Sequence, residues 1–430
     1  MNSRSRPEEA YVWIWLPGAT EPVVAGRIVR DGERLIFNYG QSYLAREDAI
    51  AIYEPELPLG RGAIMPQSGL NIAGCLRDGA PDAWGRRVIL NRTLGLRGKD
   101  ADIGALDELT YMLESGSDRI GALDFQLSAT DYEPRAAKAA TLEELLSAAE
   151  KVEAGVLLTS ELDQALFHGS SLGGARPKAM IEDGDRKLIA KFSSSSDTHN
   201  VVKGEFIAMR LASKVGLHAA PVRLERAAGK DVLLVERFDR VRVMQGWERK
   251  AMVSALTLFG LDEMMARYAS YEDLTEIIRH RFTKPKETLR ELFGRLVFNI
   301  LCGNTDDHAR NHAAFWDGKH LTLTPAFDIC PQNRTGNEAS QAMLITGDNR
   351  MSKLSTCIEA APHFLLAPES AEQMIVDQVE TLCATWSEVC AQANVNPVER
   401  KLLADHVFLN SFIFEGAPGR LGALPYHLEA

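Results

Sequence analysis

The chain has 430 residues, a length that predicts two or three domains at roughly 100–200 residues per domain. Apolar residues make up 45% of the sequence and charged residues 25%, a balance typical of folded globular proteins that argues against wholesale disorder. With 48 Lys and Arg against 59 Asp and Glu, the net charge is −11, so non-specific binding to nucleic acid or to an anionic membrane is not expected.

Cysteine usage and hydropathy predict the compartment. The six cysteines form no C-x-x-C pair and are too scattered for a disulfide framework, so we expect reduced thiols and no structural zinc site. No apolar run is long enough for a transmembrane helix, and the first residues lack the pattern of a signal peptide. We therefore expect a cytoplasmic protein without membrane contact.

Residues 1–130 predict a small α+β subdomain without a chemical motif of its own. Residues 11–16 predict a strand, and residues 23–30 and 35–39 predict a β-hairpin around an Asp-Gly turn. Residues 80–94 show a helical pattern.

A further helix is predicted at residues 141–154, at the joint between this subdomain and the rest. Thr141 is the expected N-cap, and Glu144 stands at the capping-box position.

A glycine-rich segment, GSSLGGA, follows at residues 169–175. Gly173 and Gly174 would let backbone N–H groups approach a phosphate closely. The segment matches neither G-x-G-x-x-G nor a Walker A motif, and a plain turn is the alternative interpretation.

Residues 179–182 and 187–192 predict a second hairpin, which carries Lys191 in the apolar sequence LIAKF. A buried ammonium group is costly without a partner, so one interpretation pairs Lys191 with a phosphate. The alternative is an edge-strand lysine that reaches water. On the next predicted helix, residues 203–214, Glu205 is the candidate partner of Lys191, or simply an acid favoured by the helix dipole.

The strand predicted at residues 232–235 leads into Glu236 and Phe238. These residues stand where the pattern changes from strand-rich to helical, which is the place of the hinge in a two-lobed kinase. Their backbone groups would read adenine there, with Phe238 as an apolar face. We place a nucleotide-binding domain at residues 131–240 and a helical domain at residues 241–430.

The most informative segment is residues 296–331, LVFNILCGNTDDHARNHAAFWDGKHLTLTPAFDICP. An apolar helical run ends at Gly303, and a polar loop follows at residues 304–311. Residues 313–316 and 321–324 predict a hairpin around an Asp-Gly turn. Because antiparallel pairing returns the chain to its start, the loop and the residues after the hairpin should lie side by side.

Asp306, Asn311 and Asp328 should therefore share one small volume, and two carboxylates with an amide are suited to Mg²⁺. The spacing D-x4-N is that of the kinase catalytic loop, in which Asp orients the acceptor hydroxyl and Asn binds metal. The alternative is that all three are turn and cap residues. We interpret the flanking His308 and His312 as residues that hold the loop by hydrogen bonds rather than as metal ligands or acid–base groups.

Five segments together resemble the HipA-like serine/threonine kinases, the toxin half of a type II toxin–antitoxin module: SSLGGARPKAMI, LIAKF, LLVERFDR, NTDDHARNH and LTPAFDICP. The amino-terminal strands and GCLRDGAPDAWGRR also look like that family's first subdomain. The resemblance implies an α+β, bilobal protein-kinase-like fold, with a strand-rich N-terminal lobe, an extra small N-terminal subdomain and a mainly helical C-terminal lobe. It also implies transfer of the ATP γ-phosphate to a protein hydroxyl with Mg²⁺.

The resemblance also implies roles for single residues in the helical domain and the hairpin. Asp306 resembles the family's catalytic Asp, Asn311 and Asp328 resemble its magnesium ligands, and Lys191 resembles its phosphate-binding lysine. Arg310 departs from the family, which often has Lys there. Because Arg is a planar fork and Lys a point charge, a γ-phosphate contact at this position stays open.

In the hinge and the glycine-rich loop, Glu236 and Phe238 match the family's adenine hinge. Ser171 matches the loop serine whose autophosphorylation switches the kinase off, with Ser170 as the alternative site. A phosphate in this loop would repel the phosphates of ATP.

The resemblance predicts a small helix-turn-helix DNA-binding antitoxin as partner and an aminoacyl-tRNA synthetase as substrate. The chain has no helix-turn-helix pattern or basic stripe of its own, so we do not expect it to bind DNA alone. Two alternatives stay open: an atypical kinase for a small molecule or lipid, and a pseudokinase or co-repressor scaffold. The lack of a basic amphipathic helix argues against lipid, and intact Lys191, Asp306, Asn311 and Asp328 argue against a scaffold.

Overall fold

The computed structural model describes residues 6–95, 102–135, 140–156, 158–159, 162, 166, 176–194, 197, 199–333, 336, 338–422 and 428. The chain divides into two compact units. Unit 1 comprises Met1–Asp197, Glu225–Val253 and Phe315–Lys319, and unit 2 comprises Thr198–Leu224, Ser254–Ala314 and His320–Ala430. Helices and strands both contribute, so the α+β fold class is confirmed. The finer division into three domains, with boundaries at 130 and 240, stays a prediction.

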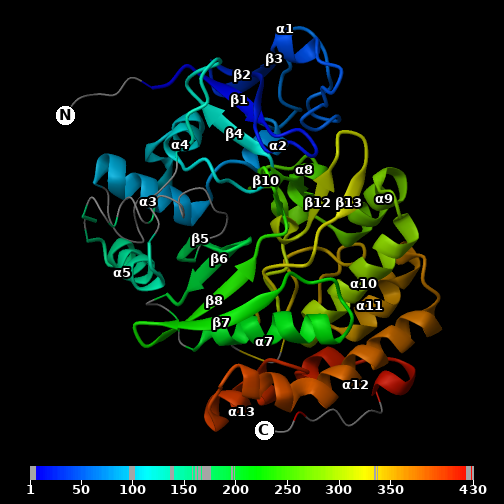
Figure 1. The fold of residues 1–430 in the computed structure, drawn as a ribbon. Coiled ribbons are helices and arrows are strands. Elements are labelled where there is room, and N and C mark those ends of the chain that lie inside the picture. The colour runs from blue at the N-terminus through cyan, green and yellow to red at the C-terminus, as the bar shows by residue number, and fades with distance from the viewer. Residues whose placement is uncertain are drawn as a thin grey trace. The chain divides into compact units, whose positions relative to one another are not determined.

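Unit 1 begins with a four-stranded antiparallel sheet in the order β3-β2-β1-β4 (Figure 1). β2 and β3 form the predicted hairpin, and Gly32 in its turn has the positive φ, 59°, that such turns require. The elements are β1 (Glu9–Ile14), β2 (Val23–Asp31), β3 (Arg34–Tyr39), α1 (Gln41–Leu44), α2 (Gly74–Arg77), α3 (Ala83–Leu94), the short 3₁₀ helix η1 (Ile103–Ala105), α4 (Glu108–Glu114) and β4 (Leu123–Gln126).

A second four-stranded sheet, in the order β5-β6-β8-β7, follows in the chain. Its apolar face packs on α5 and on Trp84 of α3 around a continuous core. The capping box predicted for α5 is present: Glu144 N donates to Thr141 Oγ1 (3.2 Å) and Thr141 N to Glu144 Oε2 (2.8 Å). The elements are α5 (Leu142–Glu153), β5 (Lys178–Asp183), β6 (Arg186–Phe192), β7 (Val222–Ala227) and β8 (Lys230–Glu236).

A hairpin that the sequence did not predict follows β8, and it consists of β9 (Arg240–Val243) and β10 (Gly246–Arg249). The alternation of Arg and Val over Arg240–Val243 is a strand signal that the sequence analysis did not use.

Unit 2 is mainly helical and is built around α10, which is buried over most of its length. α12 runs along α7 and also packs on α10 (Figure 1). The helices are α7 (Val201–Lys214), α8 (Ala255–Leu258), α9 (Tyr271–Arg281), α10 (Pro285–Leu301), α11 (Leu354–Ala360), α12 (Pro368–Gln392) and α13 (Pro397–His406). The short 3₁₀ helices are η3 (Ala266–Tyr268), η4 (Ala309–Asn311), η5 (Ala361–Phe364), η6 (Ser411–Phe414) and η7 (Gly419–Gly422).

A third sheet has the order β11-β12-β13, with β11 (Ala251–Ser254), β12 (Ala313–Trp316) and β13 (Leu321–Leu323). β12 and β13 are the hairpin predicted after the polar loop.

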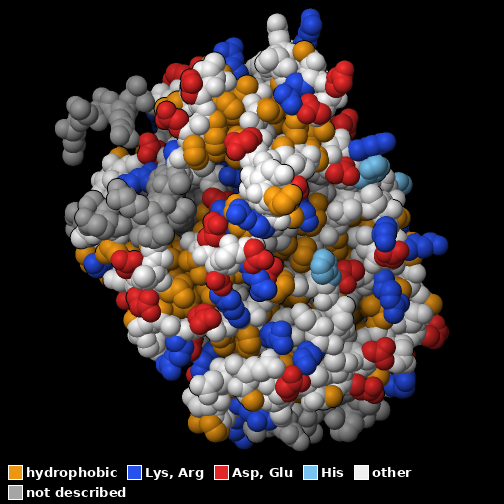
Figure 2. Space-filling view, viewed as in Figure 1, with side chains coloured by type: hydrophobic (Ala, Val, Ile, Leu, Met, Phe, Trp, Pro, Cys, Tyr) orange, Lys and Arg blue, Asp and Glu red, His pale blue; other side chains and the backbone are white. Residues whose placement is uncertain are grey.

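Over the described residues, no helix combines the length and the apolar character needed to cross a membrane. All six cysteines fall within these residues, and none of them forms a disulfide. On the face shown in Figure 2, Lys and Arg side chains are interspersed with Asp and Glu.

Candidate active site

The predicted catalytic loop begins directly after α10. The helix ends at Leu301, and Gly303 then turns the chain with a φ of 68°. A Cβ at this glycine would lie 2.9 Å from the carbonyl oxygen of Val407, so both the conformation and the space favour glycine. The turn fixes where the loop leaves the buried helix.

A hydrogen bond between Asn311 and Asp306 closes the exposed side of this loop. Asn311 Nδ2 donates to the backbone oxygen of Asp306 (3.0 Å), and the η4 turn between them is held by Asn311 N, which donates to the oxygen of His308 (2.8 Å). Asp306 is exposed, whereas the next residue, Asp307, is only 1% exposed. Of the two adjacent carboxylates, Asp306 is therefore the one that can meet a substrate.

Asp328 lies in a segment that is hydrogen-bonded to both ends of this loop. On one flank, Thr324 N donates to the oxygen of Ala313 (3.1 Å), and on the other, Gln332 N donates to the oxygen of Gly303 (3.0 Å). Asp328 itself has a φ of 58°, a conformation that is uncommon outside glycine and that concentrates at functional sites. The structure thus places the segment of Asp328 beside the loop of Asp306.

The donor atoms available here fit Mg²⁺, which prefers oxygen ligands. Because Asn311 uses Nδ2 to donate to Asp306, this contact leaves its amide oxygen as a candidate metal ligand. Within the described part of the chain, no group of three or more His, Cys, Asp or Glu side chains could hold a metal ion. A site with one carboxylate and one amide would need phosphate oxygens and water to complete its coordination, which is how Mg²⁺ is usually bound with nucleotides.

Tyr271, Asp307 and His312 form a buried group beneath the loop, which we call the Asp307 clamp. His312 Nε2 lies 2.8 Å from Asp307 Oδ1, and the Tyr271 hydroxyl donates to Asp307 Oδ2. Burial alone would raise the pKa of Asp307, but His312 and these hydrogen bonds lower it below its usual value. Burial and the Asp307 charge raise the pKa of Tyr271. For His312, the expected hydrogen bond within the loop is present.

Two other residues flanking the loop are less buried. His308 is half-buried, and Arg310 forms an ion pair with Glu263. A phosphate contact from Arg310 stays a prediction. Glu205 is buried on α7 in unit 2 and Lys191 lies on β6 in unit 1, and their pairing also stays a prediction.

In unit 1, Lys191 has a neighbour that the sequence analysis did not single out. Lys178 on β5 is its direct partner in the antiparallel pair, so the two side chains leave the same face of the sheet. Lys178 is 6% exposed and Lys191 is half-buried. Because like charges directly opposite one another are unfavourable, this pair favours negative charge nearby.

Glu236 and Phe238 stand at the end of β8. Arg237 N donates to the oxygen of Lys187 on β6 (2.8 Å), so the backbone groups of the neighbouring Glu236 point away from β6. Phe238 is half-buried and meets the ring of Phe315 edge to face at 5.9 Å. The carboxyl end of β8 thus lies beside an aromatic side chain.

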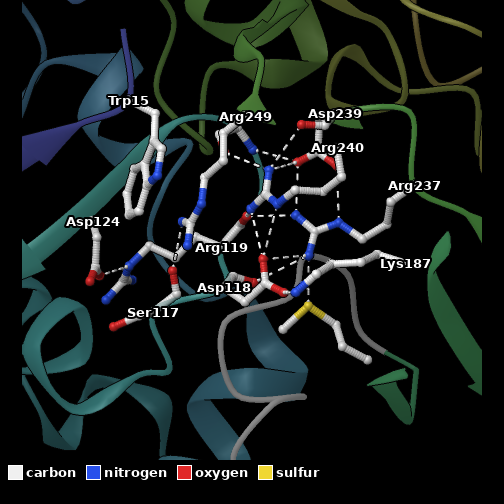
Figure 3. Close-up of polar contacts among 12 residues, drawn as sticks. Trp15, Ser117, Asp118, Arg119, Asp124, Lys187, Arg237, Asp239, Arg240 and Arg249 are labelled. Atoms are coloured by element: carbon white, nitrogen blue, oxygen red, sulfur yellow. Dashed lines mark hydrogen bonds and ion pairs between the residues drawn. The ribbon is translucent and has the colours of Figure 1, made fainter. Parts of the chain in front are cut away.

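Charged residues that the sequence analysis passed over hold this strand end in place. Figure 3 shows Asp118 among three cations, with contacts to Lys187 (2.8 Å), Arg237 (3.0 Å) and Arg240 (2.8 Å). Arg237 and Arg240 also bind Asp239 (2.8 and 2.9 Å). We call these five residues the Asp118 cluster. The signal in the sequence was ERFDR, four charges directly after a buried strand.

The cluster is charge-balanced well enough to keep its acids ionised. Burial opposes ionisation, but Arg237 and Arg240 hold the pKa of Asp118 well below its usual value and lower that of Asp239 to about 2. The residual positive charge is met by backbone oxygens, since Arg237 and Arg240 both donate to the oxygen of Arg119. The hinge segment is therefore fixed to the loop that precedes β4.

The glycine-rich loop lies outside the described residues. This applies to all four of its predicted site residues, Ser170, Ser171, Gly173 and Gly174.

Two family models match the chain. The HipA-like C-terminal domain matches residues 170–386, which is half of the chain, and the HipA N-terminal domain matches residues 15–126. Among curated relatives, the kinase candidate Y4mE of Sinorhizobium fredii is 29% identical over 175 residues, covering 37% of this chain and 41% of that protein. The serine/threonine-protein kinase toxin HipA of Shewanella oneidensis is 24% identical over 183 residues, covering 37% of this chain and 42% of that toxin. The matched region is therefore less than half the length of either relative.

A solved structure matches over nearly the whole chain. It is HipA in the Shewanella oneidensis MR-1 complex of HipA, HipB and operator DNA, with a TM-score of 0.68 and 18% identity, and it covers 91% of this chain and 94% of that one. At this identity the likeness shows a shared fold.

Proposed function

Because the chain belongs to the HipA-like family, we propose that it is an ATP-dependent serine/threonine kinase that phosphorylates a protein hydroxyl. One observation carries this proposal: the exposed Asp306 lies in a loop closed by Asn311, and hydrogen bonds on both flanks hold the segment of Asp328 to the same loop. Phosphoryl transfer depends on positioning and charge neutralisation, and this arrangement serves both.

In the helical unit, the exposed Asp306 orients the acceptor hydroxyl and accepts its proton. The Asn311 amide oxygen and the Asp328 carboxylate hold the metal. When bound, ATP would supply the γ-phosphoryl group and Mg²⁺ would neutralise its charge.

In the strand-rich unit, Lys191 provides a cation for the phosphates, and its neighbour Lys178 adds a second charge on the same face. Backbone groups at Glu236 and Phe238 bind adenine, with the Phe238 ring against its plane. The Asp118 cluster holds this end of β8 in place.

As for its biology, we propose a growth-inhibiting toxin whose activity is held in check by a small helix-turn-helix DNA-binding antitoxin. Support comes from the family and from the solved relative, whose structure contains HipB and operator DNA. Autophosphorylation at Ser171, or at Ser170, would switch the kinase off. An aminoacyl-tRNA synthetase is the proposed class of substrate.

The metal assignment is tested by nucleotide-dependent stabilisation. ATP with Mg²⁺ should raise the melting temperature by linkage, and Asp328→Ala should remove most of that rise. The exposed Asp348 offers a matched control, and Asp348→Ala should behave as wild type. An equal rise without Mg²⁺, or in Asp328→Ala, would refute the assignment.

The chemistry is tested with Asp306→Ala, which should bind ATP and Mg²⁺ but transfer no phosphate to protein. Mass spectrometry after incubation with ATP should find one phosphate on the peptide of Ser171 in wild type and none in Asp306→Ala. Phosphate retained in this peptide by Ser171→Ala would assign the site to Ser170. Growth inhibition that survives Asp306→Ala would contradict a kinase toxin.

A further inference from the structure

We propose that the Asp307 clamp is a positioning site for catalysis: Tyr271 and His312 hold Asp307 so that Asp306 and Asn311 keep their working geometry. This inference rests on the proposed kinase function. It concerns residues that touch neither nucleotide nor acceptor in that proposal, and it assigns them a role in the rate of transfer.

The first argument is the position of the clamp in the chain. Asp307 directly follows Asp306, and His312 directly follows Asn311. The contact between Asp307 and His312 (2.8 Å) therefore spans the same interval as the contact between Asn311 Nδ2 and the Asp306 oxygen (3.0 Å). The loop is closed twice, once on its exposed side and once on its buried side.

The second argument is burial. Tyr271, Asp307 and His312 are 0, 1 and 3% exposed, whereas Asp306 is exposed and Asn311 half-buried. Neighbours along an extended chain point to opposite sides, and His312 has extended backbone angles (φ −115°, ψ 134°). In each pair the second residue is buried and the first is exposed or half-buried, so fixing the buried side chain restrains the backbone from which its neighbour projects.

The third argument is how firmly the clamp is anchored. Tyr271 is the first residue of α9, its N–H donates to the oxygen of Leu344 (2.8 Å), and its ring packs against Phe364. The backbone oxygen of His312 accepts from Ala255 N (2.8 Å). Two separate segments, at Tyr271 and at Ala255, are therefore bonded to the loop. Such anchoring matters because a shift of about 1 Å at reacting groups can cost roughly a hundredfold in rate.

Tyr271→Phe tests the clamp with the loss of a single oxygen atom. The variant should lower kcat by roughly ten- to a hundredfold and raise the Mg²⁺ concentration needed for half-maximal transfer, as expected for residues that orient metal ligands. The KM for ATP should stay unchanged. Tyr268→Phe is the matched control, because Tyr268 is 55% exposed in the same unit, and its kinetics should equal those of wild type.

Asp307→Asn should have a larger effect in the same direction, since the amide nitrogen cannot accept a hydrogen bond. Each variant is measured at a temperature at which its circular dichroism matches that of wild type. Wild-type kcat and Mg²⁺ dependence in Tyr271→Phe would overturn the proposal. A loss of kcat that only follows the unfolded fraction would also overturn it.

Hydrogen exchange separates this inference from the kinase proposal. The peptide covering residues 303–313 should exchange faster in Tyr271→Phe than in wild type or Tyr268→Phe, while peptides of unit 1 stay unchanged. If wild type transfers no phosphate, the kinase proposal fails, and the exchange rate of this peptide still decides whether the clamp holds the loop. Unchanged exchange there would overturn the clamp.

Discussion

The Asp118 cluster in unit 1 and the Asp307 clamp in unit 2 both take carboxylates out of water, but they stabilise them by different means. In the cluster, Arg237 and Arg240 surround Asp118 and Asp239 with permanent charges and with hydrogen bonds to backbone oxygens. In the clamp, hydrogen bonds from the His312 ring, the Tyr271 hydroxyl and the Asn299 side chain hold Asp307.

This difference indicates how each group should respond to the loss of one of its residues. In a cluster of permanent charges, opposite charges offset one another. Removal of one residue therefore leaves buried charge on its partners without full compensation. A clamp of directional hydrogen bonds loses alignment before it loses much stability. We therefore expect the cluster to control whether unit 1 folds, and the clamp to control how well the loop in unit 2 performs.

Removal of the central cation should have the largest effect on stability. Arg237→Ala leaves Asp118 and Asp239 with Arg240 as their remaining shared cation and should cost about 3–5 kcal/mol of unfolding free energy. Tryptophan fluorescence during urea unfolding is a suitable measurement, because Trp386 alone of the six tryptophans lies in unit 2. Arg226→Ala, at an exposed arginine of β7, should cost less than about 0.5 kcal/mol. Equal losses in the two variants would refute the charge balance.

The dependence of the unfolding free energy on acidic pH should test the same charge compensation at Asp239. Its pKa is lowered from 3.8 to about 2 in the folded protein, so its stabilisation is complete above pH 4 and is lost as the pH falls through 2. The shift corresponds to about 2 kcal/mol. Unfolding free energies measured between pH 5 and pH 2 should fall less steeply in Asp239→Asn than in wild type. Identical slopes would contradict the assigned shift.

Loss of the clamp hydroxyl should cost less stability. Tyr271→Phe removes one hydrogen bond to a charged group, for about 1.5 kcal/mol, while His312 still binds Asp307. Thermal unfolding followed by circular dichroism would measure it, with Tyr268→Phe as the reference. A loss as large as that of Arg237→Ala would remove the distinction between clamp and cluster.

The exposed ion pair beside the loop should matter least. Glu263 is 54% exposed at its side chain, so Glu263→Gln should cost less than about 1 kcal/mol despite the contact with Arg310. Whatever loss is measured in dilute buffer should vanish in high salt, because exposed charges are screened. A loss that persists in high salt would mean that the pair acts as part of a buried network.

Features set by neighbouring residues were predictable from the sequence. The capping box of Thr141 and Glu144 and the hairpins around Asp-Gly turns depend on contacts within a few residues, and both were predicted correctly. The hairpin of β12 and β13 also allowed the position of Asp328 beside the catalytic loop to be predicted. The D-x4-N spacing alone identified Asp306 and Asn311 as candidate residues of this loop.

The sequence by itself determined the local elements, the family resemblance and the candidate residues in the loop, because those depend on short separations and on residue type. Only the tertiary structure decided which carboxylate of the pair Asp306 and Asp307 is exposed and which is clamped. Tyr271 lies 36 positions from Asp307, and Arg237 lies 119 positions from Asp118. Such contacts form only when packing brings remote segments together, since the cost of burying a charge selects its partners by distance in space and not by separation along the chain.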